Sequence, residues 1–116
     1  MAAKTKKKPR VVVYYPARVD PEIGDLPCAD LLPLEILHIA PTAEAAGWEV
    51  VLIDAMTEPN GLQQVLEACE GAVAFASSCI LGFQVWDGAQ VASAVRQKFP
   101  DLPMMWGGWF PSSIPE

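Results

Sequence analysis

The sequence has few of the residues that build metal centres and disulfide frameworks. Its 116 residues include three cysteines, Cys28, Cys69 and Cys79, which are widely separated and form no Cys-x-x-Cys pair. An odd number of separated thiols indicates neither a disulfide framework nor a zinc site. The single histidine, His38, falls within a predicted helix and has no second histidine to act with. We therefore expect neither metal-ligating nor catalytic residues in this chain.

Long apolar runs are absent as well. A proline, glycine, aspartate or glutamate interrupts every candidate run before it reaches the ~20 residues that a membrane-spanning helix needs. The apolar stretch at residues 11–15 is too short for a signal peptide, and Pro16 follows it directly. We therefore expect no transmembrane segment and a cytoplasmic protein.

Positive charge is scarce beyond the N-terminus. Five of the eight basic residues precede Val11, whereas all fourteen acidic residues follow it. A body with this excess of negative charge repels phosphate backbones, so nucleic acid is not an expected partner. The basic start of the chain, residues 1–9, is predicted to be a disordered, solvated segment.

Short apolar runs alternate with helical patterns along residues 10–116. Residues 10–15, 49–53, 72–76 and 102–106 are typical of strands buried in a parallel sheet. Helical periodicity occupies the three intervals, at residues 33–46, 62–69 and 85–99. This order predicts an α/β fold with a doubly wound parallel sheet of the Rossmann-like or flavodoxin-like kind. Because such sheets usually have a fifth strand, we expect the domain to be incomplete at its C-terminus.

Small polar residues and glycines follow the predicted strands at their carboxyl ends, where open parallel sheets bind ligands. These ends carry Tyr15, Pro16, Asp54, Ser77, Ser78, Gly107 and Gly108. The paired glycines would let a flat ligand approach the backbone, although ordinary turns also account for the serines and the glycines. Neither GxGxxG nor GxxxxGK follows the first strand, which disfavours a dinucleotide or P-loop site.

Four segments carry a resemblance to one family. MMWGGWFPSSIPE, residues 104–116, is similar to the WGG-x-[HF]-P-[TS]-x-x-PE segment of radical S-adenosylmethionine proteins with an N-terminal cobalamin-binding domain. FASSCILGFQV, PLEILHIAPTAEAAGWEVVLIDA and VVVYYP resemble that domain's third strand and loop, its first helix and second strand, and its opening strand. The resemblance extends over residues 11–116 and is closest to the group of the anaerobic Mg-protoporphyrin monomethyl ester oxidative cyclase.

The resemblance implies cobalamin as the cofactor, with the corrin ring over the carboxyl ends of the strands and the nucleotide tail beside the sheet. The cofactor-binding residues that it implies are Ser77, Ser78, Gly82, Gln84, Gly107, Gly108 and Trp109. Ser77 and Trp109 are included because they flank matched positions. Since Gly108 follows the fourth strand, we expect its replacement by valine to abolish cobalamin retention and leave the fold largely intact.

Two departures refine what the resemblance implies. The DxHxxG histidine that methionine-synthase-type domains offer to cobalt is missing after the first strand, so cobalamin would bind without a protein histidine on the metal. The CxxxCxxC triad is also missing, which assigns S-adenosylmethionine and the 4Fe-4S cluster to a downstream radical SAM domain, a partner in cis. We expect a cobalamin-binding module of a methyltransferase or oxidative cyclase, not catalytic alone. The alternative is a flavodoxin-like structural or interaction domain of a radical SAM protein that no longer binds cobalamin.

Overall fold

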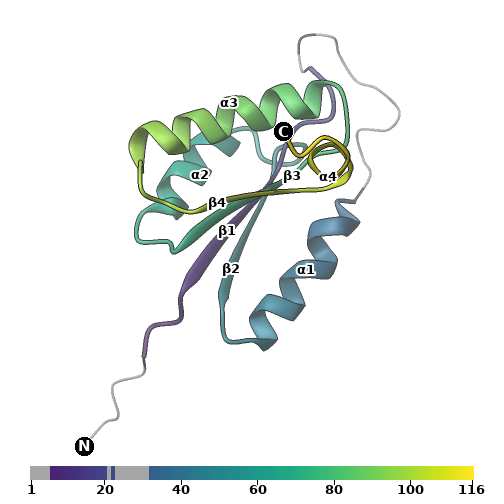
Figure 1. Cartoon of the computed structure of the whole chain (residues 1–116). Coiled ribbons are helices and arrows are strands. Elements are labelled where there is room, and N and C mark those ends of the chain that lie inside the picture. The colour runs from purple at the N-terminus through teal and green to yellow at the C-terminus, as the bar shows by residue number, and fades with distance from the viewer. Residues whose placement is uncertain (1–5, 21, 23–31) are drawn as a thin grey trace, which may run out of the picture.

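The computed structural model describes residues 6–20, 22 and 32–116 (Figure 1). Residues 1–5, which were predicted to be disordered, and Cys28 lie outside the described residues. Residues 6–9 are exposed and belong to no helix or strand. The elements are β1 Arg10–Tyr15, α1 Leu34–Ala45, β2 Glu49–Asp54, α2 Gly61–Cys69, β3 Ala74–Ser78, α3 Phe83–Lys98, β4 Met104–Gly107 and α4 Trp109–Ser113. The predicted alternation of strands and helices is confirmed, and α4 is an addition to it.

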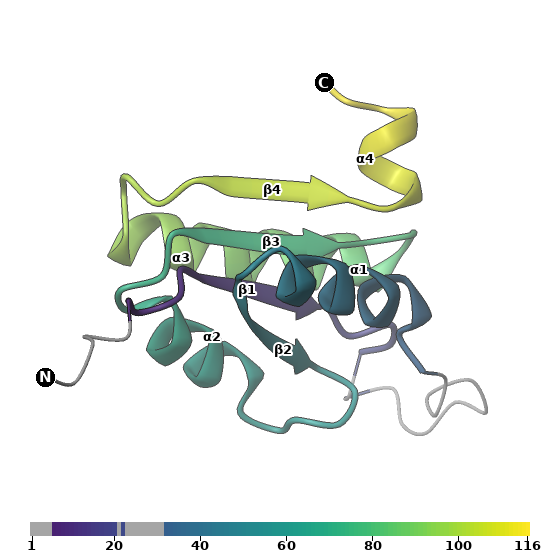
Figure 2. The same cartoon turned by 90° about the horizontal axis from the view of Figure 1, so that it is seen from below.

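The four strands form one parallel sheet in the order β2-β1-β3-β4 (Figure 2). Because β1 lies at the centre, both of its neighbours reach it through helical crossovers, as the sequence pattern requires of parallel strands. The predicted α/β fold with a parallel sheet is therefore confirmed. All four carboxyl ends lie at the same end of the sheet, where Tyr15 pairs with Asp54 and Ser78 pairs with Gly107.

One face of the sheet is covered by α2 and α3 (Figure 1). The larger core lies here, and strand residues such as Val12 and Phe75 pack in it with Val65 of α2 and Val95 of α3. These four side chains are fully shielded from solvent. Alternate residues of β4, Met104 and Trp106, also pack against this core. We call this side of the sheet the closed face.

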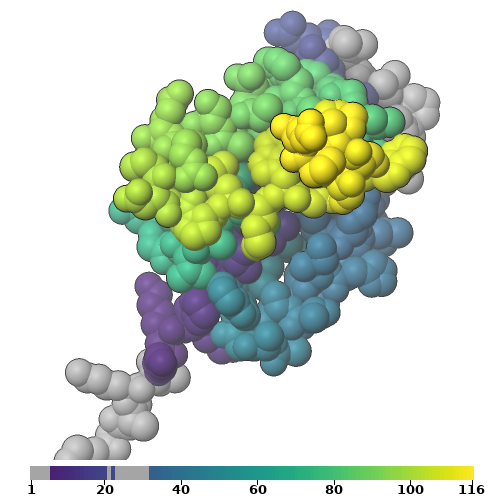
Figure 3. Space-filling view, viewed as in Figure 1, coloured from purple at the N-terminus to yellow at the C-terminus, as the bar shows by residue number. Residues whose placement is uncertain are grey.

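The other face carries α1, which buries Ile36 against Val11, Val13, Tyr15 and Ala74. This smaller core does not include β4. Met105 alternates with Met104 and Trp106, so it points to the α1 side, and 57% of its side chain is exposed. Gly107 is exposed on the same side. Figure 3 shows β4 and α4, in yellow-green and yellow, on the molecular surface above α1. We call this side the open face.

Candidate functional site

Tyr15, Ser78 and Gly107 form a row across β1, β3 and β4 on the α1 side of the sheet, at the carboxyl ends of the strands. Tyr15 and Ser78 are buried in this row, and Gly107 is exposed. The pairing of Tyr14 with Ser77 and of Ser78 with Gly107 fixes their register. Adjacent strands are about 4.8 Å apart, so the row spans roughly 10 Å from β1 to β4. The structure therefore brings together the predicted residues Ser78 and Gly107, which end two strands that are far apart in the sequence.

Gly108 is required by the fold itself. Its φ is +97°, a conformation that favours glycine, and a Cβ atom there would lie 2.5 Å from the backbone oxygen of Cys79. The Cys79 N–H donates to the Gly107 oxygen at 3.1 Å, which holds the two loops together. A valine at position 108 would collide with this backbone contact, which argues against the expectation that Gly108→Val leaves the fold largely intact.

Gly107 differs from its neighbour. No atom lies within 4 Å of the position that a Cβ would occupy on Gly107, and its φ is outside the region that favours glycine. Packing within the described residues therefore does not require a glycine at this position. A side chain there would project into open space from the exposed end of β4.

Gln84 is a positioning residue. Its side chain is 1% exposed, its Nε2 donates to the Pro16 oxygen at 3.1 Å, and its Oε1 accepts the Ile80 N–H at 2.7 Å. The amide thus ties the loop after β1 to the loop after β3. Gly82 directly precedes α3 as its N-cap residue, with a φ of +66°, and no atom lies within 4 Å of the Cβ position there. These two predicted residues shape the strand ends rather than presenting polar atoms on the row.

Ser77 and Trp109 have different surroundings. Ser77 faces the closed side in register with Tyr14 and Trp106, and its buried Oγ has no hydrogen-bond partner among the described residues. It therefore lies on the opposite face from Ser78. Trp109 is 67% exposed at the start of α4, and Leu81 in the loop after β3 is also largely exposed. Apolar side chains from both loops thus rim the strand ends.

Arg18 was not singled out from the sequence. Its Nε donates to the Tyr15 hydroxyl at 2.9 Å, and its Nη2 donates to the same oxygen. The guanidinium carbon lies 5.2 Å from the centre of the Tyr15 ring, within the range of a cation–π interaction. One signal in the sequence could have identified it: Arg18 is the only basic residue between Arg10 and Arg96.

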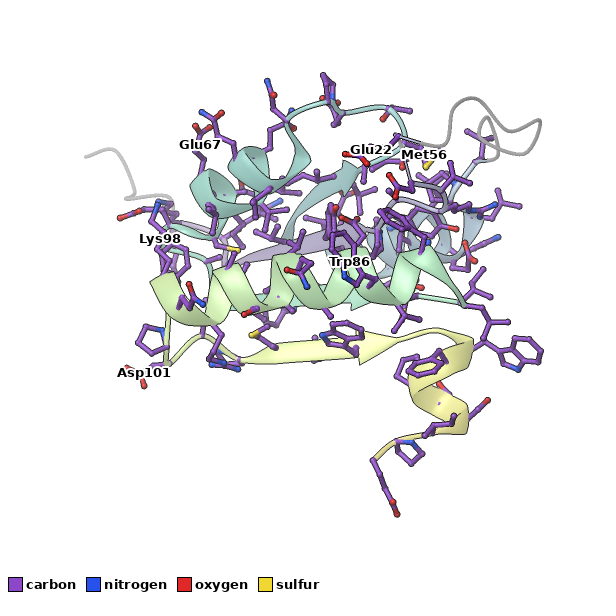
Figure 4. All side chains as sticks on the ribbon, turned by 90° about the horizontal axis from the view of Figure 1, so that it is seen from above. Glu22, Met56, Glu67, Trp86, Lys98 and Asp101 are labelled. Atoms are coloured by element: carbon purple, nitrogen blue, oxygen red, sulfur yellow. The ribbon has the colours of Figure 1, made fainter. Side chains whose placement is uncertain are left out.

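A separate cavity of about 590 Å³ opens on the closed side, between α2, α3 and the loops after β1 and β2. The Tyr14 hydroxyl donates to Asp87 Oδ2 at 2.6 Å, and the Ala17 N–H donates to the same oxygen at 2.8 Å. Burial and then the Asp87 carboxylate raise the pKa of Tyr14 above its usual range, so the phenol keeps its proton. Trp86 and Glu22 also line the cavity, and Figure 4 shows Lys98 and Asp101 well away from them, at one end of the molecule. Sequence reasoning missed this cavity because its walls come from four separate segments.

Within the part of the chain that the structure describes, no group of three or more histidine, cysteine, aspartate or glutamate side chains is arranged to hold a metal ion. The described helices also include none that is long and apolar enough to cross a membrane. Comparisons with protein-family models, curated proteins and solved structures found no match to this chain.

Proposed function

We propose that this chain is a cobalamin-binding module of a radical SAM enzyme, of the methyltransferase or oxidative cyclase type. The order β2-β1-β3-β4, with α1 on one face and α2 and α3 on the other, supports a doubly wound sheet of the flavodoxin-like kind. In such sheets, ligands bind outside the carboxyl ends of the strands, where the direction of the crossovers reverses. In this chain that point lies between β1 and β3.

The observation that carries the proposal is the pairing of Ser78, which is 6% exposed, with the exposed Gly107 at the carboxyl ends of β3 and β4. The sequence resemblance assigns both residues to the cofactor, and their strands pair so that these two residues lie side by side. A cobalamin needs backbone that it can approach closely and an apolar rim for its large ring. Gly107 offers the first, and Leu81 and Trp109 offer the second. The residues present therefore fit this group.

The residues of the chain hold and orient the cofactor in this proposal. Gln84 fixes the separation of the loops after β1 and β3, and Gly108 fixes the loop after β4. Bound cobalamin would supply a transferable methyl group or an electron carrier to a radical SAM domain in cis, which would contribute S-adenosylmethionine and the 4Fe-4S cluster. His38 is exposed on α1 and belongs to neither core, and the proposal assigns no protein histidine to the cofactor.

A structural or interaction domain without cobalamin is the second candidate. Two observations favour it. The close approach of the Cys79 backbone explains why residue 108 is a glycine, and two hydrogen bonds within the chain explain the buried Gln84, so neither residue requires a ligand. The two candidate functions make different predictions for Gly107. The packing of the described residues does not require a glycine there, so only a bound ligand would make its replacement harmful.

Equilibrium dialysis against hydroxocobalamin, followed by an absorbance spectrum of the retained corrin, tests the proposal. We expect the chain to retain corrin and to change its spectrum. We expect Gly107→Val to lower the affinity at least roughly tenfold with an unchanged denaturation midpoint, since its side chain meets open space. Asp101→Val, exposed in the turn before β4, is the control and should bind as the wild type does. An unchanged spectrum, with no corrin retained at high micromolar wild-type protein, would refute the function.

A further inference from the structure

One wall of the closed-side cavity is a single face of α3. The residues of this wall are Phe83, Trp86, Asp87, Gln90 and Val91, whose spacing of three and four residues places them on the same side of a helix. The centres of the Phe83 and Trp86 rings lie 5.2 Å apart, and Trp86 is 57% exposed. A volume of about 590 Å³ suits a small organic molecule. The cavity can therefore hold such a molecule against aromatic rings.

The carboxylate of Asp87 is held in this wall by two neutral donors. Its Oδ2 accepts the Tyr14 hydroxyl at 2.6 Å and the Ala17 N–H at 2.8 Å, and neither donor brings a positive charge to it. Within residues 6–20, 22 and 32–116, Asp87 forms no ion pair, and its Oδ1 accepts no hydrogen bond. A ligand that donates to Oδ1 therefore displaces no partner in the part of the chain that the structure describes.

The chain has no basic side chain to neutralise the cavity. Glu58, which also lines it, accepts a hydrogen bond from the uncharged Gln64 amide at 2.8 Å. Residues 19–95 contain neither lysine nor arginine. Arg18 donates to the Tyr15 hydroxyl and is not among the lining residues, and Lys98 ends α3 far from the cavity (Figure 4). A positive charge in this cavity must therefore come from a ligand.

The chemistry of the walls selects an organic cation over the other ligand classes. An anion would meet the Asp87 and Glu58 carboxylates with no basic group beside them. A bare metal ion needs several ligating side chains, and no such group exists among the described residues. An ammonium ion makes charge-assisted hydrogen bonds to a carboxylate and is attracted to the faces of aromatic rings such as that of Trp86.

We infer that this cavity binds a small organic ammonium ion with an apolar body. The nitrogen donates to Asp87, and the apolar body lies against Phe83 and Trp86. The site is separate from the one proposed for cobalamin, because neither Ser78 nor Gly107 lines it. The inference therefore goes beyond the proposed function and does not depend on it.

The test compares three probes that share a phenyl ring and a two-carbon chain: phenethylammonium, the neutral 2-phenylethanol and the anionic 3-phenylpropanoate. Calorimetric titrations of the chain, without corrinoid, measure their affinities at neutral pH. We expect phenethylammonium to bind at least roughly tenfold more tightly than the alcohol, and the propanoate to bind more weakly than both. Nuclear magnetic resonance should show shifts at the Trp86 indole N–H and at the Ala17 and Gly61 amides, which lie around the cavity.

Two variants assign the recognition to the wall of α3. Asp87→Asn keeps an oxygen that can accept the same two hydrogen bonds but removes the charge. It should weaken phenethylammonium binding roughly tenfold to a hundredfold and leave the affinity for 2-phenylethanol within about twofold. Trp86→Ala, at an exposed position, should weaken phenethylammonium binding at least roughly threefold without lowering the denaturation midpoint. Asp101→Asn, exposed at the other end of the molecule, removes the same charge and is the matched control.

Four results would overturn the inference. One is equal affinity for the three probes, and another is no measurable binding of phenethylammonium at millimolar concentration. A third is an equal loss of phenethylammonium affinity in Asp87→Asn and Asp101→Asn, which would assign the selectivity to the net charge of the chain. The fourth is shifts confined to residues outside the cavity. Denaturation midpoints separate lost recognition from lost folding in Asp87→Asn, and Trp86→Ala decides the test if that variant does not fold.

Discussion

The two faces of the sheet are built from the same strands but are completed differently. On the closed face, Phe75 and Val12 are fully shielded beneath α2 and α3. On the open face, α1 covers the β1 side, whereas Met105 and Gly107 at β4 remain exposed. Apolar burial stabilises a fold roughly in proportion to the area removed from water. The closed face, which holds the larger core, therefore supplies more of the folding free energy than the open face does.

The largest expected difference between the faces is in stability. Phe75→Ala removes a fully shielded ring from the closed core and should lower the free energy of unfolding by about 3–5 kcal/mol. Met105→Ala, on the exposed side of β4, should change it by no more than about 0.5 kcal/mol. Urea denaturation followed by circular dichroism measures both values. Similar losses in the two variants would mean that the open face is as tightly packed as the closed face.

The two adjacent glycines at the end of β4 should differ in how well they tolerate a side chain: packing requires a glycine at position 108 and does not require one at position 107. Gly108→Ala places a Cβ against the Cys79 backbone at a positive φ and should cost about 1–3 kcal/mol of stability. Gly107→Ala meets no atom within 4 Å and should stay within about 0.5 kcal/mol of the wild type. Denaturation curves of the two variants provide the measurement. A loss at position 107 equal to that at position 108 would contradict the assignment of Gly107 to the ligand.

A smaller effect is expected from alkaline pH on the closed face. Burial raises the pKa of the Cys69 thiol from 9.0 to about 11. As the pH rises, the unfolded chain therefore loses this proton before the folded chain does. The free energy of unfolding should fall as the pH rises from about 9 towards 11, and below pH 9 this thiol should cause no pH dependence, because it is protonated in both states. Tyr14, whose pKa is also raised, contributes to the same decline. Cys69→Ala should show a shallower fall in the denaturation midpoint between pH 8 and 10.5. An identical slope in the variant would contradict the burial of this thiol.

The smallest effect is expected at His38. This side chain is exposed on α1 and does not belong to the row at the strand ends. His38→Ala should therefore leave the corrin spectrum and the cobalamin affinity unchanged. Absorbance titration with hydroxocobalamin measures both, and a shift in cobalt coordination on removal of this histidine would overturn the proposed mode of binding.

The regular elements of the fold were predictable because their signals are local. Buried parallel strands are short, β-branched or apolar runs, and β1 and β2 appear in the sequence as RVVVYY and EVVLI. β3 and β4 begin two residues later than predicted, at Ala74 and Met104. In both cases the preceding residues bond to the end of a helix: the Ala72 N–H donates to the oxygen of Cys69, the last residue of α2, and the Leu102 N–H donates to the oxygen of Phe99, which directly follows α3. α4 has five residues, too few to show a helical period.

The site was predictable only in part. The adjacent serines were both assigned to it, yet successive residues of a strand point to opposite faces, so Ser77 and Ser78 are separated by the sheet. The need for glycine at position 108 depends on the close approach of the Cys79 backbone, which tertiary packing alone creates. The Arg18 contact with Tyr15 likewise depends on the course of the chain after β1. Pattern identifies the strand ends, whereas packing determines which residues are free to act there.

Amide hydrogen exchange with and without hydroxocobalamin tests most directly the claim that ligand binds on the open face. The account predicts slower exchange at residues 79–82 and 107–110, which flank Ser78 and Gly107, and no change along α2. Protection confined to residues 58–62 and 86–90, around the cavity of the closed side, would contradict the account, as would the absence of any protection at a saturating corrin concentration.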